Sequence, residues 1–176
     1  MDQTPGTGRA VRWGVTDAEV AASYTCDELR PGAAGRWLRG VDVDASPAHT
    51  FRWLCQLRAA PYSYDLVDNL GRRSPRTLTP GLERLEVGQQ VATVFRLQSF
   101  VDGEEITLTL PPSRVARASG DMAVTYRVEP RAGGSRLLAV LRVRALPRPV
   151  MTALAWGDLV MMRRQLLTLS ALASST

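Results

Sequence analysis

The second half of the chain alternates apolar and polar residues over four consecutive segments, and this pattern limits the fold more than any other feature. Glycine- and proline-containing turn signals separate the segments. A period of two predicts a meander of antiparallel strands with one apolar face, which another element has to cover. The apolar sides of the expected strands comprise Val91, Thr93, Phe95 and Leu97; Ile106, Leu108 and Leu110; Met122, Val124, Tyr126 and Val128; and Leu137, Ala139, Leu141 and Val143.

The covering element is expected at the end of the chain. Residues 150–173 are rich in apolar side chains and long enough for about six helical turns. An earlier strand is expected over 36–43, followed by a short helix over 47–59 that has Ser46 as its N-cap and Pro47 in its first turn. This order of elements predicts an α+β domain in which a curved antiparallel sheet wraps around a long C-terminal helix.

The 176 residues fit one domain with a substantial core. Residues 1–10 are rich in glycine, threonine and proline, and we expect them to be disordered. Residues 11–35 contain a capping-box pattern and then Pro31 and Gly32, which is typical of an arm packed on the domain. The main domain itself is expected over 36–173.

The net charge of +5 raises the question of nucleic-acid binding, but all 22 basic residues are arginines scattered along the chain, without a basic stripe. We therefore expect no nucleic-acid partner. Asp158, Arg163 and Arg164 interrupt the most apolar stretch, so no membrane insertion is expected. Cys26 and Cys55 make a poor disulfide framework and no secretory signal pattern occurs, which favours a cytoplasmic protein. The oligomeric state does not follow from the sequence.

Two polar residues of the expected C-terminal helix, Asp158 and Gln165, fall on its apolar face when successive residues are placed about 100° apart. A buried carboxylate has to be paired or change its pKa, and no basic residue lies one turn further along the helix. Arg72 and Arg73 are candidate partners. An ion pair that fastens the helix and a polar anchor for a ligand both remain open. The apolar arc consists of Met151, Leu154, Met161, Met162 and Leu169.

The segment 61–73 joins two tyrosines, two aspartates, an asparagine and paired arginines without clear periodicity. Tyr62 and Tyr64 suit the mouth of a pocket, where their hydroxyls could bind a ligand, and plain packing is the alternative. Asp65, Asp68 and Asn69 could orient a ligand or serve as acid and base, but helix-capping and turn roles are common for these residue types in such segments.

Other kinds of chemistry lack the residues that they need. His49 is the single histidine, and Cys55 lies six residues later, on a different side of the expected short helix, so the two cannot form a nucleophile and base pair. No metal-ligand spacing and no nucleotide-binding or hydrolase motif occurs. We expect neither a metal nor a cofactor.

Five short motifs are similar to a known superfamily: WGVTDAEV at 13–20, VDVDASP at 41–47, YSYD at 62–65, NLGR at 69–72 and MMRRQL at 161–166. Through them the chain resembles the START-like superfamily labelled SRPBCC, and its actinobacterial members in particular. The superfamily has the helix-grip fold and includes polyketide cyclases and lipid-transfer domains. The resemblance implies a cavity between the concave sheet face and the long helix, with two short helices near its mouth.

We therefore predict a protein that binds a hydrophobic or aromatic, polyketide- or lipid-like molecule as a carrier, sensor or sequestering protein. One alternative is a polyketide cyclase or aromatase, in which Asp158, assisted by Tyr62 or Tyr64, acts as a base. Another is a structural or partner-binding domain whose cavity is filled by side chains. The sequence favours binding over catalysis. The expected ligand contacts are Tyr62, Tyr64, Asp65, Asn69, Phe95, Leu108, Tyr126, Leu141, Met151, Leu154, Asp158, Met161, Met162 and Gln165.

Overall fold

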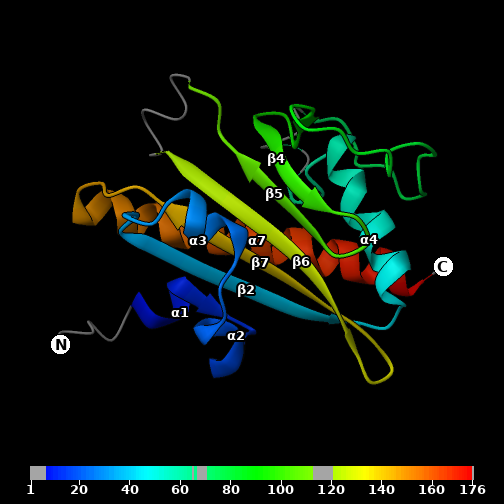
Figure 1. Ribbon diagram of the computed structural model, residues 1–176, viewed down its shortest axis with the longest axis horizontal. Coiled ribbons are helices and arrows are strands. Elements are labelled where there is room, and N and C mark those ends of the chain that lie inside the picture. The colour runs from blue at the N-terminus through cyan, green and yellow to red at the C-terminus, as the bar shows by residue number, and fades with distance from the viewer. Residues whose placement is uncertain (1–6, 65, 67–70, 113–120, 176) are drawn as a thin grey trace.

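A seven-stranded sheet curves around one long helix, α7 (Arg148–Ser174), in the computed structural model, which describes residues 7–64, 66, 71–112 and 121–175 (Figure 1). The strands lie in the order β1-β2-β7-β6-β5-β4-β3. All neighbours are antiparallel except β1 and β2. The strands are β1 (Arg12–Trp13), β2 (Gly35–Val43), β3 (Gln90–Val91), β4 (Phe95–Val101), β5 (Glu105–Thr109), β6 (Met122–Arg131) and β7 (Gly134–Val143).

The predicted fold class is confirmed. Strands β5, β6 and β7 form the expected meander, and a tight turn at Gly133, whose φ is +79°, joins the last two. This left-handed backbone conformation is open to glycine at little steric cost. Strand β2 then pairs with β7 over its whole length and places the N-terminal part of the domain next to the last strand.

The expectation of one continuous strand through residues 91–97 is wrong. Strand β3 ends at Val91, the chain turns back through 92–94, and Phe95 at the start of β4 pairs with Val91. Ala92 and Thr93 take positive φ angles of 44° and 67°. Alternation of apolar residues continued across the turn in the sequence, and no glycine, proline or asparagine marked it.

The concave face of the sheet packs against α7, which lies behind the strands in Figure 1. Helix α7 buries Met162, Leu166 and Leu169 there, while α4 (Pro47–Cys55) and the short helix η1 (Gln56–Arg58) add Trp53 and Leu57 at one end. The expected cap is confirmed, since the Ser46 hydroxyl accepts the backbone N–H of His49 at 3.3 Å. No helix in the described part of the chain combines the length and hydropathy that a membrane span requires.

The convex face carries a second, smaller core beneath the N-terminal arm. Helices α2 (Asp17–Ala21) and α3 (Thr25–Leu29) follow each other in this arm, and Tyr24 and Cys26 pack against Leu38 of β2 and Val140 of β7. The face opposite the predicted apolar one is therefore also partly apolar and covered. The capping box of α2 is present, because Thr16 and Glu19 exchange hydrogen bonds at 2.6 and 3.2 Å.

Part of the N-terminal segment that the sequence predicts to be disordered is helical. Residues 7–10, expected to be disordered, belong to helix α1 (Thr7–Val11), which packs against α7. Ala10 is completely buried, and its carbonyl accepts a hydrogen bond of 2.6 Å from Arg39. Burial of one small side chain and satisfaction of one buried carbonyl explain why this short segment is fixed.

Both cysteines are free thiols inside the protein. Cys55 belongs to the main core, whereas Cys26 lies in the smaller core on the convex face. Burial raises the pKa of both thiols, that of Cys55 to about 12. They are therefore protonated at neutral pH and poorly nucleophilic.

Candidate functional site

A cavity of about 160 Å³ lies between the concave face of the sheet and α7. Strand residues form an apolar wall, and α7 supplies two methionines and two polar residues. The position agrees with the cavity that the resemblance implied. Its lining consists of Ser63, Ala92, Phe95, Leu108, Met122, Val124, Tyr126, Leu141, Asp158, Met161, Met162 and Gln165.

Among the described residues of this lining, Asp158 is the one ionisable carboxylate, and it is paired with Arg39 of β2. Nη2 of Arg39 lies 2.9 Å from Oδ2 of Asp158 and also donates to the Ala10 carbonyl. The Arg39 side chain is completely buried, whereas the Asp158 side chain keeps 15% of its surface accessible. The guanidinium thus stands behind the carboxylate, and the carboxylate borders the cavity.

Burial changes the proton affinity of this pair. Desolvation raises the pKa of Asp158 to about 6, and the nearby charge of Arg39 only partly opposes that rise. Desolvation also lowers the pKa of Arg39, again against the attraction of its partner. Guanidinium groups stay protonated in proteins, so Asp158 is the member of the pair that titrates.

Tyr126 and Gln165 are hydrogen-bonded to each other in the wall of the cavity. The Tyr126 hydroxyl donates to Oε1 of Gln165 at 2.6 Å, and Nε2 of Gln165 donates to the Pro61 carbonyl at 2.6 Å. Burial raises the pKa of Tyr126, which keeps the hydroxyl protonated as a donor. These two hydrogen bonds connect β6, α7 and the segment after η1. The Tyr126 hydroxyl oxygen can still accept a hydrogen bond from a ligand.

The structure gathers eight of the expected ligand contacts around this one cavity: Phe95, Leu108, Tyr126, Leu141, Asp158, Met161, Met162 and Gln165. Met151 and Leu154 pack against the core without lining the cavity. Tyr62 is buried and lines a neighbouring pocket, and Tyr64 is exposed. Asp65, Asp68 and Asn69 lie outside the described residues.

Sequence reasoning missed four residues of the lining. Met122 and Val124 share a strand face with Tyr126, so their alternation could have placed them there. Ser63 and Ala92 sit in irregular segments with no periodic signal.

The expected partner of Asp158 is also wrong, since Arg39 takes this role in place of Arg72 or Arg73. Arg39 lies on the same side of β2 as Trp37 and Val41. In the sequence, this alternation was the one sign that the Arg39 side chain points into the core. Among the residues that the structure describes, no group of three or more His, Cys, Asp or Glu side chains could hold a metal ion.

Comparison with solved structures finds the same architecture in proteins of low sequence identity. A protein from Thermobifida fusca matches with a TM-score of 0.55 and 13% identity over 80% of this chain and 93% of that chain. The chain has the START-like helix-grip fold. Ginseng major latex-like protein 151, from Panax ginseng, shares this helix-grip fold with a TM-score of 0.50 and 10% identity over 82% of this chain and 97% of that chain.

The di-domain ARO/CYC StfQ from the steffimycin biosynthetic pathway is a further helix-grip neighbour, with a TM-score of 0.50 and 12% identity. The match covers 84% of this chain and 53% of StfQ. No family model and no curated protein matches the sequence. At these identities the likeness is one of fold, and function has to be argued from the site.

Proposed function

We propose that the protein binds a hydrophobic or aromatic small molecule in the cavity beneath α7, as a carrier, sensor or sequestering protein. The observation that carries this proposal is a mostly apolar space in which Asp158 is the single ionisable carboxylate among the lining residues that the structure describes. Apolar walls with a few placed polar groups are typical of small-molecule sites. Each Å² of apolar ligand surface removed from water would contribute roughly 25 cal/mol.

The size of the cavity limits its contents. An apolar protein cavity of roughly 150 Å³ is large enough for benzene, so the 160 Å³ here suits a single ring or a short branched chain. A larger ligand needs side chains to move, and Met161 and Met162 are suited to this because methionine is unbranched and flexible.

Native mass spectrometry of the protein purified from its own host tests the proposal directly. A reproducible adduct of one small molecule per chain, released on denaturation, is the expected result, and extraction would identify the molecule. A bare mass, together with no binding of small aromatic probes in calorimetry, would contradict the proposal and favour a domain whose cavity is filled.

A pair of substitutions on α7 tests the location. Met161→Phe places a larger side chain in the cavity, whereas Leu154→Phe makes a similar enlargement on the same helix outside its lining. We expect Met161→Phe to weaken binding of an aromatic probe at least about tenfold, a loss of about 1.4 kcal/mol, and Leu154→Phe to leave it within about twofold. Calorimetric titration of both folded variants checks this. Equal affinities would place the ligand elsewhere.

A second candidate function is polyketide cyclisation or aromatisation, favoured by one observation. The pKa of Asp158, raised to about 6, suits a general base that operates near neutral pH. Tyr126 shares the cavity with Asp158, whereas Tyr62 and Tyr64 do not line it. Asp158→Asn should then abolish turnover of a bound polyketide while retaining its binding. Turnover that survives in this variant would remove Asp158 from the chemistry.

A further inference from the structure

A second pocket, of about 290 Å³, adjoins the cavity, and we propose that it binds the anionic head of the same ligand. This inference rests on the proposed function and narrows its ligand to an amphipathic anion, with an apolar body in the cavity and a carboxylate or phosphate in the second pocket. Three arginines line that pocket, Arg73, Arg76 and Arg164, together with Ser63 and Thr168.

The described walls of this pocket carry positive charge without a carboxylate beside it. Among the residues that the structure describes, those that line it include no carboxylate. None of the three arginines takes part in an ion pair within the described part of the chain. Three guanidinium groups around one concavity produce a positive potential that attracts an anion.

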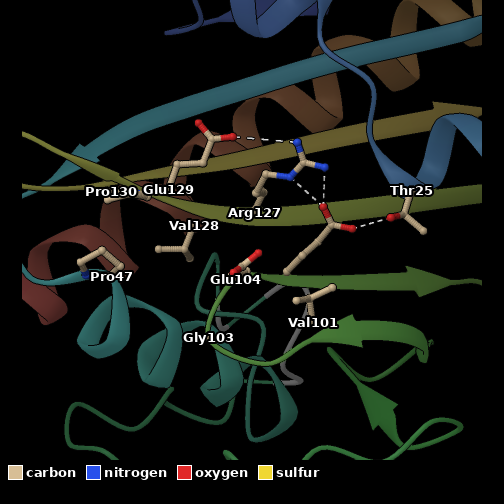
Figure 2. A pocket seen from close by; sticks show the side chains of 10 residues that line it. Thr25, Pro47, Val101, Gly103, Glu104, Arg127, Val128, Glu129 and Pro130 are labelled. Atoms are coloured by element: carbon tan, nitrogen blue, oxygen red, sulfur yellow. Dashed lines mark hydrogen bonds and ion pairs between the residues drawn. The ribbon is translucent and has the colours of Figure 1, made fainter.

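Other grooves of the molecule show the contrasting arrangement. In the groove drawn in Figure 2, Arg127 lies 2.7 Å from Glu105 and 3.9 Å from Glu129, and Thr25 donates to the same Glu105 carboxylate. In another groove, which Gly14 and Asp42 also line, Arg136 forms an ion pair with Glu19 at 2.7 Å. Arginines there are already bound to carboxylates, so these grooves offer no comparable anion site.

The arginine-lined pocket, defined by Arg73, Arg76 and Arg164, shares a lining residue with the cavity. Ser63 borders both spaces. On α7, Met161 faces the cavity and Thr168 faces the arginine-lined pocket. Seven residues of helix separate them, or about 10 Å along the axis. One ligand with a spacer of a few carbon atoms can therefore reach from one space to the other.

The backbone at this junction is held in a strained conformation. Tyr62 has a φ of 56°, in the left-handed region that a bulky side chain rarely adopts. Its buried ring packs edge-on against Trp53 at 6.3 Å, and the preceding carbonyl accepts the Gln165 amide. Such strain persists where the surroundings fix it, and it is frequent at ligand sites. The junction is therefore preformed.

The chemistry of the head follows from the guanidinium group. Arginine binds carboxylates and phosphates through paired, charge-assisted hydrogen bonds. Together the cavity and the arginine-lined pocket reach the range of roughly 300–1,000 Å³ that is usual for small-molecule sites. The cavity alone falls below that range.

Matched probes test the inference. We would titrate phenylalkanoic acids with one to five methylene groups, the corresponding phenylalkanols and the phenylalkyl phosphates into the folded protein by calorimetry at low salt. We expect the best anion to bind at least about tenfold more tightly than its alcohol, with an optimum at one spacer length. The head with the larger advantage, carboxylate or phosphate, identifies the natural class.

Three variants locate the effect. Arg164→Gln and Arg73→Gln/Arg76→Gln should each bring the ratio of anion to alcohol affinity down toward one. Arg163→Gln is the matched control, because Arg163 is the neighbouring residue on α7 but lies over the Trp13 ring at 5.4 Å, away from the pocket. It should leave the ratio unchanged.

The outcomes separate this inference from the proposed function. Alcohols that bind while anions gain no advantage would overturn the anion pocket and leave the cavity intact. An anion advantage that survives in the Arg164 and Arg73/Arg76 variants would overturn it as well. Failure of every probe to bind would contradict the proposed function and the inference with it.

Discussion

Asp158 illustrates how burial and an opposite charge compete at a single residue. Arg39 stabilises the carboxylate from 2.9 Å, but removal of water from the pair outweighs this attraction and raises the pKa of Asp158 from 3.8 to about 6. In the unfolded chain the same group titrates near its ordinary value. Between these two values the folded protein binds a proton that the unfolded chain releases.

The stability contributed by Asp158 should therefore decrease as the pH rises. Its contribution is complete below the unfolded pKa of 3.8 and is lost as the pH passes through about 6. Urea unfolding of the wild type and Asp158→Asn at pH 4, 5, 6 and 7 measures this, because asparagine does not titrate. The free energy of unfolding of the wild type relative to the variant should fall by about 2–3 kcal/mol. A constant difference, or one that grows with pH, would contradict the raised pKa.

The helical period of the sequence placed Asp158 and Gln165 on the apolar face of α7, which is where the structure has them. Their partners could not be predicted in the same way. Arg39 and the Pro61 carbonyl come from segments more than 100 residues away, and a periodic pattern contains no information about pairs at such distances. Tertiary packing decides them.

Among the elements, the turn between β3 and β4 shows a local conflict between sequence and conformation. Thr93 is exposed and β-branched, yet its φ is 67°. A left-handed conformation costs an L-residue about 1–2 kcal/mol, and glycine escapes this cost while losing more entropy on folding. We expect Thr93→Gly to raise the free energy of unfolding by roughly 0.5–1 kcal/mol.

Urea unfolding at neutral pH checks this expectation, with Thr93→Ala as the control. Alanine keeps the Cβ atom and with it the steric conflict, so it should bring little gain. Equal gains for both variants would show that the β-branched side chain, and not the backbone, is the cause. Destabilisation by glycine would show that the turn is unstrained.

Elements with clear periodicity were predictable and those without it were not. The strands over 122–131 and 134–143, the long helix and the Ser46 cap follow from alternation, helical length and a residue that accepts backbone N–H groups. The turn at 92–94 did not, because the apolar alternation of the two strands ran in phase across it. Short segments such as α1 depend on tertiary contacts and leave little trace in the sequence.

For the molecule as a whole, Arg39 joins three elements that lie far apart in the sequence. It lies in β2, pairs with Asp158 of α7 and donates to the Ala10 carbonyl of α1. Arg39→Met leaves a buried carboxylate and a buried carbonyl without this donor. We expect a loss of about 3–5 kcal/mol in the free energy of unfolding at pH 7.

The double variant Arg39→Met/Asp158→Leu separates charge from packing. Replacing both members of a buried ion pair by apolar residues is often neutral, so most of the loss should be recovered. Arg12→Met is a control, since its pair with Asp17 is exposed and 3.9 Å long, and it should cost less than about 1 kcal/mol. Urea unfolding of all three variants checks this. A double variant no more stable than Arg39→Met would assign the loss to packing alone.

The two cysteines lie in the separate cores on opposite faces of the sheet, Cys55 under the concave face and Cys26 under the convex one. Because each thiol is shielded and protonated, an alkylating reagent can modify it only after the structure around it opens. Alkylation of each cysteine therefore reports the local opening of one core. Their relative labelling rates would tell whether the N-terminal arm detaches before the helix and sheet separate.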